Sequence, residues 1–145
     1  MRFFKIMPEV PASFGQETVF ERVSGAPLKV TKVQLIFDGW LENDLMETSP
    51  IYYITVRLKC FLHTKNLSGI ESFEIIEALK SETFLELYPE KKLPTIYQIK
   101  INGNPFVDDF GINNGYLIIS EKVKNYLAEF NVSCASFEEI EPLST

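Results

Sequence analysis

The chain has 145 residues, of which 46% are apolar, 13% aromatic and 23% charged, and its formal net charge is −6. This apolar content excludes an intrinsically disordered chain, which has too little apolar surface to offset the entropy of ordering. The acidic balance argues against a nucleic-acid partner, because contacts to phosphate need Lys and Arg side chains.

The sequence lacks the marks of secretion and of membrane insertion. Its apolar N-terminus is interrupted by a lysine and two prolines, which a secretory signal would not tolerate. No run approaches the roughly 18 apolar residues of a membrane span. The two cysteines, Cys60 and Cys134, make no disulfide framework and are expected to be free thiols. We therefore expect a single cytoplasmic domain over residues 1–145 that does not contact a membrane.

Strands and loops are expected in the first third of the chain. Residues 1–7 read as a short strand, and the prolines and glycines of residues 8–29 predict loop. The acidic segment 41–50 predicts a loop or a short helical turn. Residues 30–37 place alternate apolar side chains on one face, which is typical of a half-buried strand: Val33, Leu35 and Phe37.

Two later segments, 53–76 and 118–140, repeat each other in part. A Ser-Phe-Glu sequence recurs at 72–74 and at 136–138. Identical residues fall at corresponding positions: Lys59 and Lys124, Leu62 and Leu127, Asn66 and Asn131, Ser68 and Ser133. The repeat predicts one small strand–helix–strand unit used twice, over about 51–76 and 115–140.

Helical spacing of apolar residues follows the first strand of each unit. The positions i, i+3 and i+4 of a helix face are apolar in both copies: Leu58, Phe61 and Leu62, then Val123, Tyr126 and Leu127, with Phe130 extending the second stripe. Ser120 is a plausible helix N-cap. Asn66 and Asn131 are expected to end the helices in the left-handed conformation. We expect both helices to pack against a sheet.

The segments between and after the units are less uniform. Residues 82–88 predict a strand, although the spacing over 71–88 also fits a helix. Residues 95–101 predict a strand that ends at an Asn-Gly turn, and a polar tail is expected from Glu141. The fold class expected is α+β, with a mainly antiparallel or mixed sheet and two main helices from an internal β-α-β duplication.

Candidate reactive groups are few. Cys60 lies three residues before His63, so the two are neighbours on a helix and could form a nucleophile and base. Asp108 and Asp109 are adjacent carboxylates, but on extended backbone they point apart. The acidic run over 138–141 would either protect a strand edge or contact a basic partner. No phosphate loop, dinucleotide fingerprint or zinc pattern is present, so we expect no cofactor and no metal.

The second half of the chain carries an ordered set of features. An aromatic strand after Leu-Pro is followed by an acidic Asp-Asp-Phe, an Ile-Ser-Glu-Lys run before a helix, and a Phe-Glu strand: Leu93-Pro94 and Tyr97, Asp108 to Phe110, Leu117 to Lys122, and Phe137-Glu138. In this order they resemble the immunity proteins of bacterial polymorphic toxin systems, which are small cytoplasmic proteins encoded beside toxins. The resemblance covers about residues 36–140.

The resemblance implies a protein without catalytic residues that binds a cognate toxin tightly and blocks it. The chain's acidity would suit a basic toxin. Exposed acidic and aromatic residues are expected to form the interface: Trp40, Glu42, Asp44, Glu47, Asp108 and Asp109. Two alternatives stay open. One is a small cytoplasmic enzyme that uses Cys60 with His63 or the two aspartates, and the other is a generic protein-interaction module.

Overall fold

The computed structural model describes residues 1–26 and 28–142. Strands are its commonest element, at 43% of the residues. The helices are α1 (Val56–His63), α2 (Glu82–Leu87) and α3 (Glu121–Leu127). The strands are β1 (Phe3–Met7), β2 (Ala12–Phe14), β3 (Val19–Glu21), β4 (Lys29–Lys32), β5 (Gln34–Phe37), β6 (Leu45–Thr48), β7 (Ile51–Thr55), β8 (Ile70–Lys80), β9 (Ile96–Ile101), β10 (Phe110–Asn113), β11 (Tyr116–Ser120) and β12 (Ser136–Ile140).

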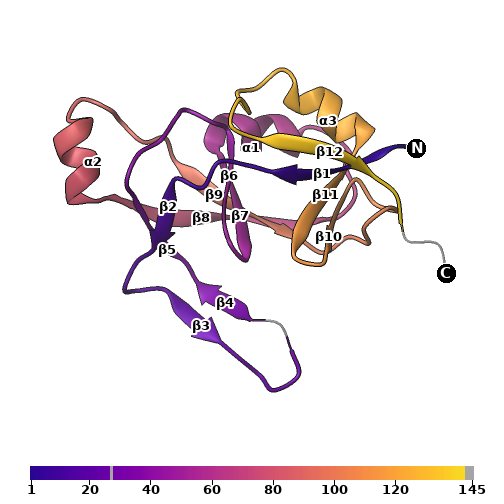
Figure 1. The fold of residues 1–145 in the computed structure, drawn as a ribbon, viewed down its shortest axis with the longest axis horizontal. Coiled ribbons are helices and arrows are strands. Elements are labelled where there is room, and N and C mark those ends of the chain that lie inside the picture. The colour runs from indigo at the N-terminus through magenta and orange to yellow at the C-terminus, as the bar shows by residue number, and fades with distance from the viewer. Residues whose placement is uncertain (27, 143–145) are drawn as a thin grey trace.

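These strands form three sheets, with the orders β10-β11-β1-β12, β2-β5-β8-β9-β7-β6 and β3-β4. The first sheet is antiparallel throughout, whereas β5 and β8 run parallel within the second. In Figure 1, α1 and α3 lie together on one side of the molecule, and the β3–β4 hairpin projects away on the other side. The sheets and helices confirm the predicted α+β class. None of the helices in the described residues is long and apolar enough to span a bilayer.

Both repeated segments fold as strand, helix, strand, as their sequences predict. In the first, β7 and β8 flank α1 in the chain, and β9 lies between them in the sheet, antiparallel to each. In the second, β11 and β12 flank α3, and β1 lies between them in the same way. Each segment is therefore completed by a strand from another part of the chain.

The likeness of the two segments extends to the hairpin before each helix. The hairpins β6–β7 and β10–β11 have matching registers, from Leu45↔Ile54 to Thr48↔Ile51 and from Phe110↔Ile119 to Asn113↔Tyr116. Counterparts lie 65 positions apart in the sequence, and the first residues of α1 and α3 have the same separation. The structural correspondence therefore begins several residues before the predicted units.

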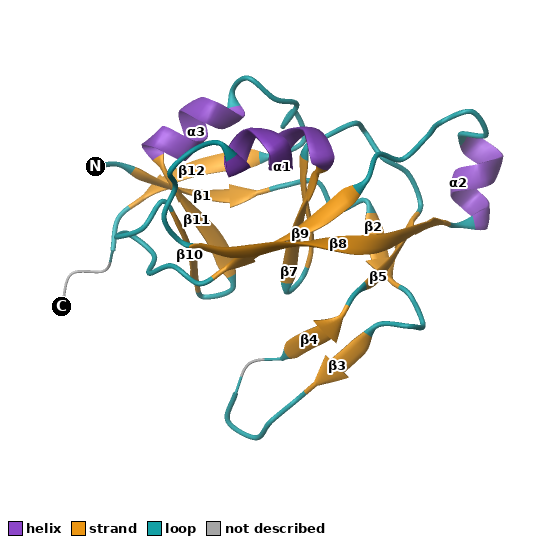
Figure 2. Ribbon diagram, turned by 180° about the vertical axis from the view of Figure 1, so that it is seen from behind, coloured by secondary structure: helices purple, strands orange, loops and turns teal. Residues whose placement is uncertain are grey.

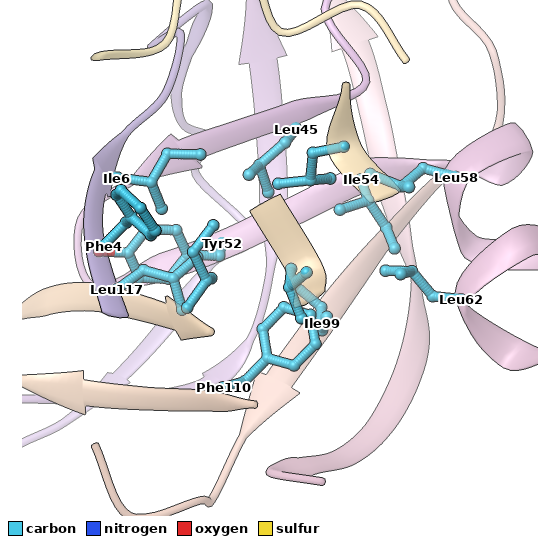
Figure 3. Packing of buried hydrophobic residues seen from close by; sticks show 13 residues of the cluster. Phe4, Ile6, Leu45, Tyr52, Ile54, Leu58, Leu62, Ile99, Phe110 and Leu117 are labelled. Carbon is cyan, nitrogen blue, oxygen red and sulfur yellow. The ribbon is translucent and has the colours of Figure 1, made fainter. Parts of the chain in front are cut away.

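One hydrophobic cluster fills the space beneath α1 and α3. Figure 3 shows apolar side chains from several strands and from α1 pointing toward one another in this space. Four of the predicted helix residues are buried there: Leu58, Leu62, Val123 and Leu127. Phe61 packs edge-on against Tyr126, with ring centroids 5.3 Å apart, and against Phe130 at 5.0 Å. The predicted packing of the helices is confirmed, and this aromatic contact joins them.

A second cluster lies on the opposite face of the six-stranded sheet. It includes Leu35 and Phe37, which confirms the alternation predicted for residues 30–37, together with Tyr53 and Phe84. Trp40 packs against its margin and is partly buried. Figure 2, drawn from behind, shows β8 running the length of the molecule toward α2 at the far end.

Two element predictions are wrong, and the structure decides a third that was open. Residues 41–50 contain β6 instead of only a loop or a short helical turn, because Leu45 and Met46 are buried and pair with β7. Residues 8–29 contain β2, β3 and the start of β4, and of this segment Pro27 lies outside the described residues. Of the two alternatives for residues 71–88, the strand is found in β8, up to Lys80, and the helix in α2, from Glu82. The Ser81 hydroxyl accepts the Phe84 N–H at 3.1 Å and starts this helix where β8 ends.

The ends of the chain's two main helices also differ from expectation. The residues after α1 and α3, Thr64 and Ala128, are right-handed. Among the described residues, positive φ occurs outside glycine at Glu42, Phe106 and Asn114, and not at the two asparagines predicted to end the helices. The predicted polar tail is described only as far as Pro142, and its remainder lies outside the described residues.

Candidate interaction surface

Asp44 lies immediately before β6 and is only 3% exposed, so its prediction as an exposed interface residue is wrong. Its carboxylate accepts the Thr55 hydroxyl at 2.6 Å and the Asn131 backbone N–H at 2.8 Å. Thr55 is the N-cap of α1 and accepts the N–H of Leu58. The exposed guanidinium of Arg57 pairs with the same carboxylate. Asp44 therefore ties α1 to the loop that follows α3.

Asp109 lies immediately before β10 and makes contacts of the same kind. Its carboxylate accepts the Ser120 hydroxyl at 2.7 Å and the Ser68 backbone N–H at 3.0 Å. Ser120 is the predicted N-cap of α3, and its hydroxyl accepts the N–H of Val123, which confirms that prediction. Since Ser68 lies in the loop after α1, each aspartate anchors one helix to the loop that follows the other.

These two helix-to-loop contacts are not predicted from the sequence, although the sequence carries a pattern that marks them. Asp44 and Asp109 are separated by the same 65 positions as the two helices, one step before each hairpin. Aspartate followed by a hairpin and a Ser or Thr cap is a repeated pattern. From the sequence, both aspartates are expected among the exposed residues of an interface, so these contacts are not predicted.

Trp40 and Glu42 lie in the strand-free segment before Asp44. The indole N–H of Trp40 donates to the Asn43 carbonyl at 3.0 Å, and Lys91 donates to the Trp40 carbonyl at 2.6 Å. Glu42 is exposed, and its carbonyl accepts the Asn131 side-chain amide at 3.0 Å. A pocket of about 270 Å³ is lined by three of the six predicted residues together with their neighbours: Trp40, Glu42, Asp44, Thr55, Val56, Arg57 and Pro94.

The other two predicted residues lie elsewhere. Glu47 on β6 is half-buried, and burial raises its pKa above the ordinary value. Asp108 accepts the backbone N–H of Asn104 at 2.6 Å and so holds the turn before β10. The structure thus brings Trp40, Glu42 and Asp44 together, keeps Asp108 beside Asp109 at the other junction, and places Glu47 apart from both groups.

The two groups considered as a nucleophile and base lie at the surface. Cys60 and His63 are both exposed on α1, and the imidazole of His63 lies edge-on to Phe73 with centroids 6.4 Å apart. The described residues hold no group of three or more His, Cys, Asp or Glu that could bind a metal ion. The acidic run of β12 lies on a sheet edge, where Glu138 pairs with Lys5 at 3.2 Å and Glu139 with Arg2 at 2.9 Å.

Glu9, which is not singled out from the sequence, contacts the chain segment that follows Trp40. One oxygen of Glu9 accepts the N–H of Leu41 at 2.9 Å, and the other is buried without a hydrogen-bond partner within the described residues. Burial raises the pKa of Glu9 above its ordinary value, and the hydrogen bond from Leu41 opposes that effect.

Comparison of the chain with protein-family models, curated proteins and solved structures found no match.

Proposed function

We propose that this chain is a cytoplasmic immunity protein that binds a cognate bacterial toxin and neutralises it without catalysis. The observation that carries the proposal is the surface formed by Trp40 and Arg57, which line one pocket, hereafter the Trp40 surface. It combines a half-buried indole with an exposed guanidinium, and Leu41, which follows Trp40 in the chain, is 60% exposed. Trp and Arg are the residues that most often dominate binding energy at protein interfaces. The resemblance of residues 36–140 to immunity proteins points to the same function.

Buried contacts hold the Trp40 surface in one conformation. Asn43, which is fully buried, accepts from the indole through its carbonyl. Asp44 fixes the guanidinium of Arg57, which also lies 4.9 Å over the ring of Phe130. A surface whose side chains are ordered before binding loses less conformational entropy when a partner docks. This organisation favours tight binding.

The state of the polar groups also favours binding over catalysis. The hydroxyls of Thr55 and Ser120 each donate to an aspartate and accept from a helix N–H, so both serve as helix caps. A hydroxyl that is engaged in a helix cap on both sides has a structural role. The net charge of −6 suits a basic toxin, because opposite charge speeds association.

We also propose that the fold arose by duplication of a unit made of a central strand, a hairpin, a helix and a final strand. In this scheme β1 belongs to the first unit and β9 to the second, and the two central strands are exchanged between the units. The matching hairpin registers and the reciprocal contacts of Asp44 and Asp109 support this origin. Residues 8–40, with β2 to β5, would be an insertion in the first unit.

The proposal predicts that a toxin-like polypeptide is encoded beside this chain, and the test of the function uses that polypeptide. Co-expression with the wild-type chain should restore growth of a bacterial host that the polypeptide arrests, and the two proteins should co-elute at 1:1. Trp40→Ala and Leu41→Asp should each weaken binding by about tenfold or more if the Trp40 surface is central. Val107→Ala, at an apolar residue exposed elsewhere, is the matched control.

Unfolding midpoints of the three variants separate loss of contact from loss of fold, since Trp40 is half-buried. If the wild-type chain neither binds the polypeptide nor restores growth, the proposed function is wrong. Binding without restored growth would instead support the alternative of a protein-interaction module.

A further inference from the structure

The strand β8 exposes apolar side chains to solvent although it is an inner strand of its sheet. It lies between β5 and β9 in the six-stranded sheet, yet Ile75 is 69% exposed and Leu79 is 43% exposed. Side chains two residues apart share a face, so both lie on the same side as Phe73, which packs in the cluster under α1. The cover that α1 gives to Phe73 does not reach the second half of the strand.

Neighbouring strands continue this apolar row. Leu79 lies opposite Ile36 on β5, and Ile75 lies opposite Tyr97 on β9. Directly opposed residues of paired strands share a face, so the row crosses three strands. We call the set of Ile36, Ile75, Glu77, Leu79 and Tyr97 the β8 face. Apolar side chains gathered on a solvent-exposed sheet face are typical of an interaction site.

A carboxylate in a fixed orientation lies in the middle of this face. Glu77 is exposed between Ile75 and Leu79, and its carboxylate accepts the side-chain amide of Gln34 at 2.7 Å. Gln34 is only 6% exposed, and its own carbonyl oxygen accepts the backbone N–H of Glu17 at 3.1 Å. Among the ion pairs of the described residues, none involves Glu77.

Gly15 makes room for this arrangement. A Cβ atom at that position would lie 2.3 Å from the side-chain oxygen of Gln34, which is an impossible approach. The glycine, the buried glutamine and the backbone of Glu17 together hold one oxygen of Glu77 and leave the carboxylate facing solvent. An anion held in place between apolar side chains is complementary to an arginine or lysine that arrives on an apolar surface.

We propose that the β8 face docks a basic protein, with an Arg or Lys of that protein paired to Glu77 and apolar side chains covering Ile75 and Leu79. The chain's net charge of −6 favours such a partner. A second copy of this chain, docked about a twofold axis through the face, would bring two Glu77 carboxylates together, and like charges repel. Naming the partner as the cognate toxin rests on the proposed function, whereas the face and its basic partner do not.

The first experiment does not need the toxin. The probe is an amidated peptide of sequence Leu-Arg-Leu-Arg-Leu, titrated into the isotope-labelled full chain while backbone amide shifts are recorded. Shift changes should gather on β5, β8 and β9, and Glu77→Gln should weaken the apparent Kd by about fivefold to tenfold. The variant keeps an oxygen for the amide of Gln34, so its fold is preserved. Glu86→Gln on α2, also an exposed glutamate, is the matched control.

The second experiment measures the toxin-like polypeptide against Glu77→Lys and Ile75→Thr, with Glu86→Lys as control. Glu77→Lys should reduce the association rate most at low salt, because it reverses a charge at the interface. If the peptide perturbs the β8 face but the polypeptide never binds, the docking proposal stands and the toxin assignment falls. If the peptide shifts are absent or scattered, or if the wild-type chain dimerises and Ile75→Thr abolishes the dimer, the docking proposal is overturned.

Discussion

The junctions at Asp44 and Asp109 make contacts of the same kind in different surroundings, although Ser68 lies two positions beyond Asn66, the counterpart of Asn131. Both carboxylates accept a helix-capping hydroxyl and a backbone N–H from the opposite loop, at distances that agree within 0.2 Å. Asp44 is buried and also binds Arg57, whereas Asp109 is half-buried and its loop partner Ser68 is exposed. The hydrogen bonds around the two carboxylates are alike and their burial differs, so we expect the two junctions to contribute unequally to stability.

The largest effect is expected where the two units are most alike. Leu62 and Leu127 occupy matching positions on α1 and α3, and both are buried in the cluster that the helices share. Leu62→Ala and Leu127→Ala should each lower the free energy of unfolding by about 2–5 kcal/mol, and by similar amounts. Urea denaturation monitored by Trp40 fluorescence gives both values.

The exposed Leu87→Ala on α2 is the control for these variants and should change stability by no more than about 0.5 kcal/mol. An unchanged midpoint for Leu127→Ala would contradict the packing of α3. A large difference in free energy of unfolding between the two leucine variants would show that the two positions are not equivalent.

The buried leucines of α1 and α3 belong to the part of the fold that the sequence predicts. Apolar spacing, a serine cap and a partial repeat were enough to predict α1, α3 and their buried faces, because these signals are local. The position of β1 between β11 and β12, and that of β9 between β7 and β8, could not be predicted, since strand order depends on contacts distant in the chain. The burial of Asp44 depends on Asn131, which comes from the other end of the chain.

A smaller and unequal pair of effects is expected at the aspartates. Asp44→Ala should cost about 3 kcal/mol, because it leaves the buried Thr55 hydroxyl and the Asn131 N–H without an acceptor. Asp109→Ala should cost about 1–2 kcal/mol, since its site is more open to water. The measurement is again the free energy of unfolding in urea.

A double-mutant cycle with the caps sharpens this prediction. Thr55→Ala should cost about 1–2 kcal/mol in the wild-type chain and much less once Asp44 is already alanine, because the two side chains share one hydrogen bond. The same non-additivity is expected for Ser120→Ala combined with Asp109→Ala. Fully additive costs at either junction would argue against the network there. Equal costs for the two aspartates would show that burial does not distinguish the copies.

The smallest effect concerns Glu9, which supports only the Asp44 side through the N–H of Leu41. Burial raises the pKa of Glu9 in the folded state, so its favourable contribution is present at low pH and is lost as the pH rises through the folded pKa. Glu9→Gln keeps an oxygen for Leu41 and has no charge to desolvate. It should therefore be more stable than the wild type at neutral pH, by no more than about 1 kcal/mol because the site is partly exposed.

The advantage of Glu9→Gln should shrink as the pH falls toward the ordinary glutamate value, where the wild-type side chain becomes neutral as well. Unfolding midpoints of both proteins across this range measure the trend. Glu47 also has a pKa raised by burial, so the wild-type profile alone would mix two groups, and only the difference between the proteins isolates Glu9. A constant difference at all pH values would show that Glu9 acts through packing, and the unpartnered oxygen would then have no electrostatic cost.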